Sequence, residues 1–588
     1  MIKNHTKNSP LINVLPFLIF FTGSFVFFGF FADYVEYYQE KLALFVFSGD
    51  YLIENITQPG SLLVYSGRFL TTFFYYPVAG AFIISLIISL IIYLISKLIN
   101  HLSGTESIII PLITGTLFFI LQTSYRYLLF NNLGVLMQLA FFYLAVRYMK
   151  GFIPVILFPL WYWITGGFAW IFLLMYTFFL AQKSISKGWP LIISLFAVSL
   201  LSVYVLKEFL IFQSLKTLLI FPVSNDDTGS HFSLFLPVIA LVTFIPFIGK
   251  LKIRLPLWLN KNDVMWKFIY PLISFLLICI SSLIHYDKAS KEYFHAERLF
   301  CQENYDDLTE YITKHPTTNR LTIFLNNIAL SETDRLNDLL FHFPQSPDGQ
   351  SLYLKWEMYG EVLRRGGYFY YATGMINEAH RWAYENMIMK GITPEGLKML
   401  IKTELINGNN QIALKYISIL YSTLFYRAEA RELEKIALDD NAIGSHPEFG
   451  VKRREKISHD FFSITDDPYV NIERVLSYDS LNRKAYMYKF AYLMLTEDYK
   501  GIATGLARLE NLGFKKIPVH LEEAALVCRM SDSTPLPDLG TLIINPQTEI
   551  RFKQFLQTFQ TYGNNLKAAE PVLKQKFGNT FWYYAFYH

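Results

Sequence analysis

Hydrophobic and polar positions follow two different patterns along the chain. Between residues 11 and 284, long apolar runs alternate with short connections that hold nearly all of the charge. From His285 onward, Lys, Arg, Asp and Glu recur every few residues, in the amphipathic pattern of soluble helices. The pattern predicts an all-α protein with a polytopic membrane domain over residues 1–286 and a soluble helical domain over residues 287–588.

The apolar runs have the lengths of membrane spans. A helix needs about 20 mostly apolar residues to cross the hydrocarbon core of a bilayer. An uncharged run over residues 152–181 is interrupted by Thr165, Gly166 and Gly167, so it is either one long span or two short ones. Seven further runs approach the required length: residues 11–31, 69–95, 108–121, 128–146, 189–206, 232–248 and 268–284.

Basic residues in the connections favour two spans within residues 152–181. With two spans and a cytoplasmic N-terminus, twelve Lys and Arg residues lie on the cytoplasmic side and five outside. A single span gives seven inside and ten outside, which opposes the positive-inside bias. We therefore predict about nine spans in a bacterial inner membrane, a first outer loop over residues 32–67 and a periplasmic C-terminal domain. Residues 11–31 exceed a signal-peptide core and should form an uncleaved anchor.

Composition agrees with a membrane protein and narrows its function. The mean hydropathy is +0.28, with 53% hydrophobic and 17% charged residues. The formal net charge of +4 is too small to imply a nucleic-acid partner. The predicted spans contain no Asp, Glu, Lys, Arg or His, which disfavours an ion or proton transporter. The three cysteines lack zinc-site spacing, and the sequence leaves open whether Cys301 and Cys528 pair.

Three acids open the first outer loop. Asp33, Glu36 and Glu40 fall on one face of a helix that continues from the first span. Such a cluster of like charges is often tolerated where a metal ion, a cation or a hydroxyl-bearing ligand is held. Asp33 and Glu36 would then be the ligands of a divalent cation, Mg²⁺ or Mn²⁺. The alternative is a solvated helical face just beyond the membrane.

Other polar residues of the outer loops are candidates for binding a substrate. Arg68 lies at the mouth of the second span, and an arginine offers paired donors that match phosphate. Arg126 lies between the third and fourth spans, where Asp33 or a lipid phosphate would be its partner. Ordinary interfacial roles remain the alternatives. The candidate substrate-binding residues are Glu40, Arg68, Arg126, Asn131, Lys207 and His231.

A first span followed at once by an acidic outer loop, and then many short spans with aromatic outer ends, resembles the GT-C superfamily of membrane glycosyltransferases. The resemblance implies a polyprenyl-phosphate-linked sugar donor and a catalytic acid in the first outer loop. By position, that catalytic role falls on Asp33, with Glu36 next. Basic residues would lie near the donor phosphate.

Two segments resemble a Bacteroidota family of multi-pass membrane proteins with no established activity. One is the turn Gln58-Pro59-Gly60 before Gly67-Arg68-Phe69-Leu70, and the other covers residues 374–383 of the soluble half. This resemblance extends over most of the chain.

The soluble half consists of amphipathic segments with turns every dozen or so residues, which indicates paired helices. The pair that ends at Pro316 resembles a tetratricopeptide unit, and similar pairs follow at uneven spacing. We predict an irregular helical solenoid whose concave side binds a protein or glycan acceptor. No catalytic constellation is apparent in this half.

These features together predict a GT-C-like glycosyltransferase or oligosaccharyltransferase for protein glycosylation, which moves a glycan from a lipid-linked donor to a periplasmic acceptor. The alternative is a non-enzymatic scaffold or assembly factor for an envelope secretion or biogenesis complex, and a lipid or polymer exporter is a weaker third. The enzyme requires a lipid-sized groove beside Asp33. The scaffold requires a filled helical bundle whose acids face water.

Overall fold

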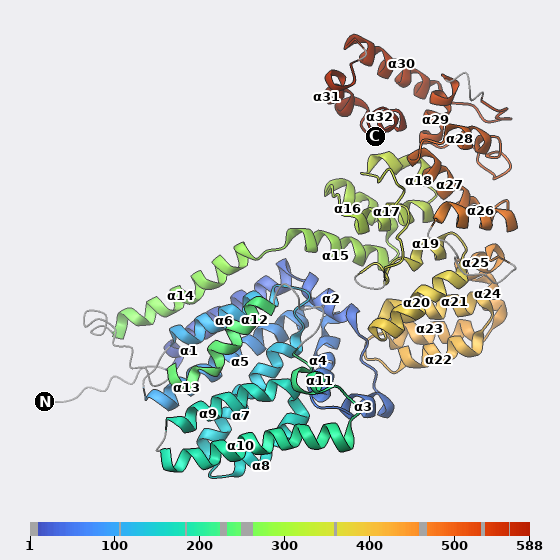
Figure 1. Ribbon diagram of the computed structural model, residues 1–588. Coiled ribbons are helices and arrows are strands. Elements are labelled where there is room, and N and C mark those ends of the chain that lie inside the picture. Colours follow the sequence, from blue (N-terminus) through green and yellow to red (C-terminus); the bar gives the residue numbers. More distant parts are fainter. Residues whose placement is uncertain are drawn as a thin grey trace. The chain divides into compact units, whose positions relative to one another are not determined.

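The computed structural model describes residues 10–104, 108–182, 185–223, 232–248, 263–357, 361–457, 467–530, 536–563 and 565–588. Within these ranges all regular secondary structure is helical, which confirms the predicted all-α class (Figure 1). The chain divides into two compact units. Unit 1 comprises Met1–Lys291 and the short segment Ser422–Phe425, and unit 2 comprises Glu292–Tyr421 and Tyr426–His588.

Unit 1 contains the apolar helices together with shorter helices of the connections. Its helices are α1 (Pro10–Val26), η1 (Phe27–Phe31), α2 (Tyr34–Leu42), α3 (Gly49–Ile56), α4 (Ser61–Thr72), η2 (Phe73–Tyr75), α5 (Pro77–Ser103), α6 (Ile109–Gln122), α7 (Leu129–Tyr148), α8 (Ile153–Thr165), η3 (Gly166–Phe168), α9 (Ala169–Ala181), α10 (Ile185–Val205), η4 (Leu206–Leu210), α11 (Leu215–Ile220), α12 (Phe232–Thr243), α13 (Ile245–Ile248) and α14 (Asp263–Ile284). The next helix, α15 (Lys288–Cys301), begins in unit 1 and continues into unit 2.

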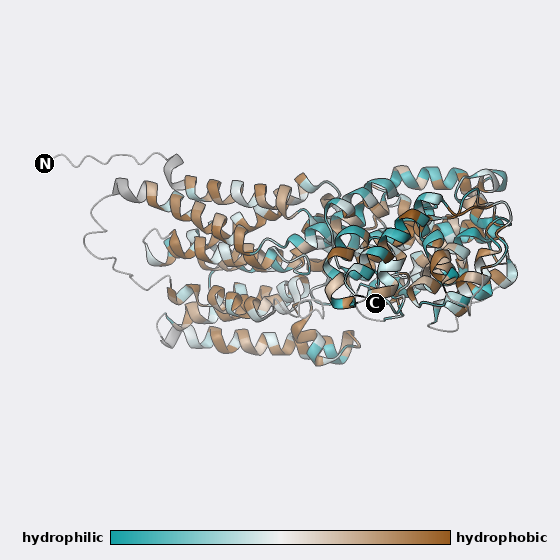
Figure 2. Ribbon diagram, turned by 90° about the horizontal axis from the view of Figure 1, so that it is seen from above, coloured by the Kyte–Doolittle hydropathy of each residue, from teal (hydrophilic) through white to brown (hydrophobic). Residues whose placement is uncertain are grey.

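The long helices of unit 1 suit a membrane. Figure 2 colours them mostly brown, for hydrophobic residues, whereas the helices of unit 2 mix brown with teal. If the bent pair Phe268–Ile284 and Lys288–Cys301 counts as one span, six stretches of the described residues are long and apolar enough to cross a bilayer. Besides the bent pair, these stretches are Val14–Phe31, Pro77–Ser103, Leu129–Tyr148, Ile153–Ala181 and Gly188–Leu210. Two further apolar helices are shorter, Ile109–Gln122 and Ser233–Thr243.

Three connections of unit 1 meet through glycines. A Cβ on Gly166 would lie 2.4 Å from the Phe221 carbonyl oxygen and 2.8 Å from the Gly60 Cα. The Gly60 amide donates to the Trp163 carbonyl at 2.9 Å, and the Gly167 amide donates to the Phe221 carbonyl at 2.7 Å. Gly166 has φ +57, which favours glycine because it has no Cβ. We call Gly60, Gly166, Gly167 and Phe221 the glycine junction.

The apolar run over residues 153–181 folds back at this junction. The ring of Trp170 lies 5.6 Å from the ring of Tyr162 and 6.0 Å from the ring of Phe158. In one straight helix, residues 158 and 170 would lie about 18 Å apart along the axis. The interruption seen in the sequence at Thr165, Gly166 and Gly167 is therefore a reversal of the chain between α8 and α9.

Unit 2 consists of shorter helices with mixed surfaces. Its helices after α15 are α16 (Tyr305–Lys314), α17 (Arg320–Glu332), α18 (Leu336–Leu339), η6 (Leu340–His342), α19 (Gly367–Ala372), α20 (Ile376–Lys390), α21 (Pro394–Asn407), α22 (Asn410–Tyr421), α23 (Arg427–Ala437), α24 (Asp440–Ser445), α25 (Phe449–Glu455), α26 (Pro468–Tyr478), α27 (Arg483–Leu495), α28 (Tyr499–Leu506), α29 (Val519–Arg529), α30 (Pro546–Thr561), α31 (Leu566–Phe577) and α32 (Phe581–Tyr587).

Several helices of unit 2 end in the same turn. The residue after the turn donates its amide to the carbonyl five positions earlier, a Schellman motif that closes the helix and redirects the chain. The residue before each donor has a positive φ; these residues are Glu303, Asp334, Gly374, Gly408 and Glu497. The five bonds run from Asn304 to Leu299, Arg335 to Leu330, Met375 to Tyr370, Asn409 to Glu404 and Asp498 to Leu493. This recurring turn joins consecutive helices, as the paired pattern of the sequence predicts.

We expect Gly166→Ala to destabilise the full chain, because the added Cβ would meet backbone atoms that have little freedom to move. Overpacking costs about 1–3 kcal/mol, and the positive φ adds about 1–3 kcal/mol for a residue with a Cβ. Gly151→Ala is the matched control, since Gly151 has φ +58 but no atom within 4 Å of the place that a Cβ would take. Thermal unfolding of the purified chain should show the larger loss for Gly166→Ala. Equal losses would contradict the close approach.

Candidate functional site

Helix α2 and its N-cap residue carry the three acids, in the connection that follows α1 and η1. It follows the π-turn η1 at the end of α1, and Asp33 is its N-cap residue. All residues from Tyr34 to Glu40 are buried, with Glu36 at 0% and Glu40 at 8% exposure. The Asp33 side chain is 22% exposed. The helix lies where the acid spacing predicts it, and Glu36 and Glu40 do not form a solvated face.

Glu36 packs against the first turn of α5. Its Cγ lies 2.5 Å from the position that a Cβ would take on Gly80, so the glycine makes room for this side chain. The first turn of a helix carries a partial positive charge, which favours a nearby carboxylate. Glu40 forms an ion pair with its neighbour Lys41 at 3.5 Å. The acids of α2 thus lie in different surroundings.

Gln39 fastens α2 to the connection between α6 and α7. Its Nε2 donates to the Tyr127 carbonyl at 2.9 Å, and its Oε1 accepts from the Leu129 amide at 3.1 Å. Gln122 donates to the same Tyr127 carbonyl at 3.1 Å. Asn132 donates to Gln122 at 2.8 Å and accepts from the Tyr127 hydroxyl at 3.0 Å. Because these buried groups bond to one another, the network holds α2 in one position.

Two predicted binding residues belong to the segment that Gln39 contacts. Asn131 is buried in the first turn of α7 and donates to the Leu128 carbonyl at 3.1 Å. Arg126 is exposed, with its guanidinium 5.5 Å from the centre of the Tyr125 ring. Tyr125 packs edge-on against Tyr38 of α2 at 4.7 Å. Arg126 is therefore placed at the surface beside α2 rather than in a buried site.

The remaining predicted binding residues are held elsewhere. Arg68 lies on α4, with its Nη1 3.4 Å from the Tyr51 hydroxyl. Lys207 lies in η4 at the end of α10 and pairs with Glu208 at 2.6 Å. His231 lies outside the described residues.

An apolar groove of about 830 Å³ runs between α1 and α14. Its walls include Leu18 and Phe27 of unit 1's first helical segment and Ile278 of α14. Phe31 and Tyr286 also line it, and they immediately precede Ala32-Asp33 and Asp287 in the chain. Pockets that bind small molecules commonly have volumes of about 300–1,000 Å³, and this groove lies within that range. The groove therefore adjoins the acid that the sequence singles out.

Charged residues that the sequence analysis did not select lie next to this groove. The Lys291 ammonium donates to the Phe30 carbonyl at 2.6 Å and lies 3.8 Å from an Asp33 carboxylate oxygen. Burial and the neighbouring Asp287 carboxylate raise the pKa of the Tyr34 phenol, so this hydroxyl stays protonated. We call Asp33, Asp287 and Lys291 the groove head. Asp287 and Lys291 follow the last apolar run directly, which is the one signal in the sequence that could have identified them.

No group of three or more His, Cys, Asp and Glu side chains in the described ranges is arranged to hold a metal ion. A divalent cation at Asp33 and Glu36 would take its further ligands from backbone oxygens, water or substrate, as hard cations commonly do.

Unit 2 holds a second candidate site, a cavity of about 480 Å³ that we call the charged cavity. Its lining contains five glutamates and four lysines. They come from segments scattered between the end of α15 and the start of α27. No short motif brings them together in the sequence, which explains why sequence reasoning found no constellation in this half.

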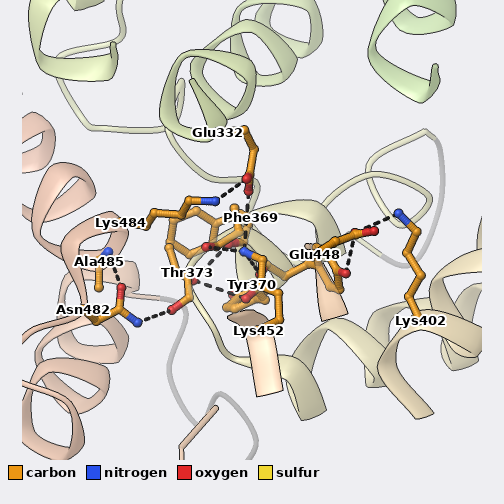
Figure 3. A network of polar contacts seen from close by, with 12 residues as sticks. Glu332, Phe369, Tyr370, Thr373, Lys402, Glu448, Lys452, Asn482, Lys484 and Ala485 are labelled. Atoms are coloured by element: carbon orange, nitrogen blue, oxygen red, sulfur yellow. Dashed lines mark hydrogen bonds and ion pairs between the residues drawn. The ribbon is translucent and has the colours of Figure 1, made fainter. Parts of the chain in front are cut away.

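Lys452 lies at the centre of the charged cavity's contacts (Figure 3). It is 3% exposed, and its ammonium donates to the Tyr371 and Ala372 carbonyls at 3.0 and 2.9 Å. Glu332 lies 3.5 Å from the same ammonium and also pairs with Lys484. Burial lowers the pKa of Lys452 to about 8, and the nearby Glu332 carboxylate offsets only part of that effect.

A second group of ion pairs surrounds Lys402 of α21. Its ammonium lies 2.7 Å from Glu303 and 2.8 Å from Glu448. Burial lowers the pKa of Lys402, but the carboxylates of Glu448 and Glu303 raise it overall. The Tyr371 hydroxyl donates to Glu448 at 2.6 Å. Lys402 therefore stays charged between two acids.

The chain belongs to DUF6057, a family of unknown function whose model matches residues 7–588. No curated protein and no solved structure gives a significant match. The expectation that a family without an established activity covers most of the chain is confirmed.

The stability of the full chain should depend on pH through Lys452. The folded chain holds this ammonium with a pKa of about 8, below the ordinary value of 10.5, so the unfolded chain binds more protons between these values. Stability should therefore rise as the pH increases from about 8 to about 9.5, by about 2 kcal/mol relative to Lys452→Met, and be lost as the pH falls through 8.

Unfolding curves of both proteins at several pH values in this interval test the expectation. The two proteins are compared by the slope of their free energy of unfolding against pH. Absolute values are not compared, because Lys452→Met also loses hydrogen bonds and should be less stable at every pH. Parallel pH profiles would show that Lys452 titrates normally.

Proposed function

We propose that the chain is a GT-C-like membrane glycosyltransferase or oligosaccharyltransferase. It transfers a glycan from a polyprenyl-phosphate-linked donor to a protein acceptor at the periplasmic face. The single observation that carries the proposal is the apolar groove between α1 and α14, which adjoins the groove head. An enzyme that acts on a lipid-linked donor needs a groove for the lipid next to groups that handle the phosphate.

The groove would bind the prenyl chain by its shape, and the groove head would recognise the donor phosphate by its charge. A prenyl chain gains little hydrophobic free energy by leaving bilayer lipid for an apolar groove, because both surroundings are equally apolar. Binding must therefore depend on fit along the groove and on charge at its end. The Lys291 side chain is 31% exposed, and its ammonium is the cation that would bind the donor phosphate.

Asp33 is the proposed base. Its carboxylate takes the proton of the acceptor hydroxyl or amide while the acceptor atom bonds to the anomeric carbon of the donor sugar. The bond from that carbon to the phosphate oxygen breaks, and its electron pair leaves with the phosphate, whose charge Lys291 stabilises. Glu36 supports α2 against α5, and the exposed Arg126 would contact the glycan or the phosphate.

The proposal includes about nine membrane crossings, with a cytoplasmic N-terminus and unit 2 in the periplasm of a bacterium with an inner membrane. The ring contacts across Gly166 support a fold-back between α8 and α9, which this number of crossings requires. The distribution of basic residues supports the orientation. The recurring turn of unit 2 supports a tetratricopeptide-like solenoid that presents the acceptor.

Asp33→Asn should lower glycan transfer by about 10²–10⁴-fold, because the amide does not accept the acceptor proton. The variant is introduced into a strain that lacks the natural gene, and glycan staining of periplasmic proteins is the measurement. Glu54→Gln, an exposed acid in the same loop, is the control and should leave the profile unchanged. A normal profile in Asp33→Asn, at equal protein abundance, would remove the role of Asp33.

Cys279→Trp should block the groove, since Cys279 lines it and the indole is much larger than the thiol. We expect less polyprenyl phosphate to copurify with this variant, as measured by mass spectrometry of extracted lipid. Ile193→Trp adds a similar bulk at a residue of α10 that is 63% exposed and should have no effect. Unchanged lipid in Cys279→Trp, together with normal transfer in Asp33→Asn, would favour the non-enzymatic scaffold.

A further inference from the structure

We propose that the charged cavity of unit 2 binds a small zwitterion, with an ammonium group at one end and a carboxylate or phosphate at the other. The proposal is independent of the glycosyltransferase function, because the lining residues all belong to unit 2. It follows from how the charges of the cavity are grouped.

One group of ion pairs has an excess of positive charge, and the other has an excess of negative charge. Around Glu332, one carboxylate faces two ammonium groups, those of Lys452 and Lys484. Around Lys402, one ammonium faces two carboxylates, those of Glu303 and Glu448. In Figure 3, Lys484 lies on one side of Lys452, and Glu448 and Lys402 lie on the other. We call the first group the lysine end and the second group the acid end.

Two further carboxylates add to the excess of negative charge at the acid end, where they contact a second lysine of α21. Lys398 lies one helical turn before Lys402 and also contacts two acids, Glu395 at 3.8 Å and Glu429 at 2.9 Å. The side chains of Glu429 and Glu303 are 43% and 55% exposed. Exposed carboxylates keep rotamer freedom, so these two can turn toward a ligand ammonium at little cost.

The arrangement selects against ligands with a single kind of charge. An anion is attracted to the lysine end but repelled by the excess carboxylates of the acid end, and the reverse holds for a cation. A zwitterion satisfies both ends at once. The cavity is of about 480 Å³, a volume that suits a small molecule.

The lining between the two ends is aromatic. The Tyr371 ring lies 5.1 Å from the Lys452 ammonium and 5.9 Å from the Lys402 ammonium. Tyr305 and Tyr368 also line the cavity. These rings provide apolar contact for the part of the ligand that joins its two charges.

Calorimetric titration of the purified full chain in detergent tests the proposal with alanyl-alanine as the probe. We expect saturable binding. N-acetyl-alanyl-alanine lacks the ammonium group and alanyl-alanine amide lacks the carboxylate, so each should bind about tenfold more weakly or not at all. Phosphoethanolamine, titrated in parallel, tells whether the lysine end prefers phosphate to carboxylate.

Variants locate the site. Lys484→Met and Glu303→Gln should each weaken binding of the zwitterion by about tenfold, and Lys484→Arg should restore much of it because the charge returns. Lys415→Met and Glu434→Gln remove exposed charges of α22 and α23 that do not line the cavity, so they should bind normally. Circular dichroism confirms that each variant is folded.

The absence of binding by both alanyl-alanine and phosphoethanolamine would overturn the proposal. So would equal binding of the zwitterion and its two capped forms, or binding that folded Lys484→Met and Glu303→Gln leave unchanged. Glu303 is an exposed turn residue, so its variant should fold even if Lys484→Met does not.

Discussion

Backbone contact at the glycine junction is the constraint on which three connections of unit 1 depend. Gly60 brings the first connection against Trp163, and Gly166 and Gly167 let the chain between α8 and α9 approach Phe221 at main-chain distance. Side chains cannot intervene there, so the three segments hold one another directly. Earlier in unit 1, Gln39 holds α2 in place through hydrogen bonds to the connection between α6 and α7. These contacts fix the position of α2 and therefore of the acids that it carries.

Much of unit 1 could be predicted from the sequence because its signals are local. Uncharged length predicts the apolar helices, and the spacing of Asp33, Glu36 and Glu40 predicts a helix at α2. The burial of Glu36 could not be predicted, because spacing defines a helical face but not what covers it. Gln39 illustrates the reason: its partners Tyr127 and Leu129 lie 88 and 90 positions further along the chain.

Unit 2 shows the same limit more strongly. Amphipathic periodicity predicts its helices, and the turns that join them follow from local chemistry. The charged cavity depends instead on pairs such as Lys484 with Glu332, which are 152 positions apart. In a single sequence, each of these residues looks like an ordinary solvated charge of a helix surface. Only the fold brings enough of them together in one cavity for their balance of charge to matter.

The groove between α1 and α14 is built from the first and the last apolar helices of unit 1. The Ser274 hydroxyl of α14 donates to the Pro16 carbonyl of α1 at 2.7 Å, and Gly23 allows Ile278 to pack closely against α1. During synthesis, α1 therefore precedes its partner α14 by more than 200 residues. The groove is therefore complete only after α14 has been made and has packed against α1, so its two walls come from opposite ends of unit 1's long sequence.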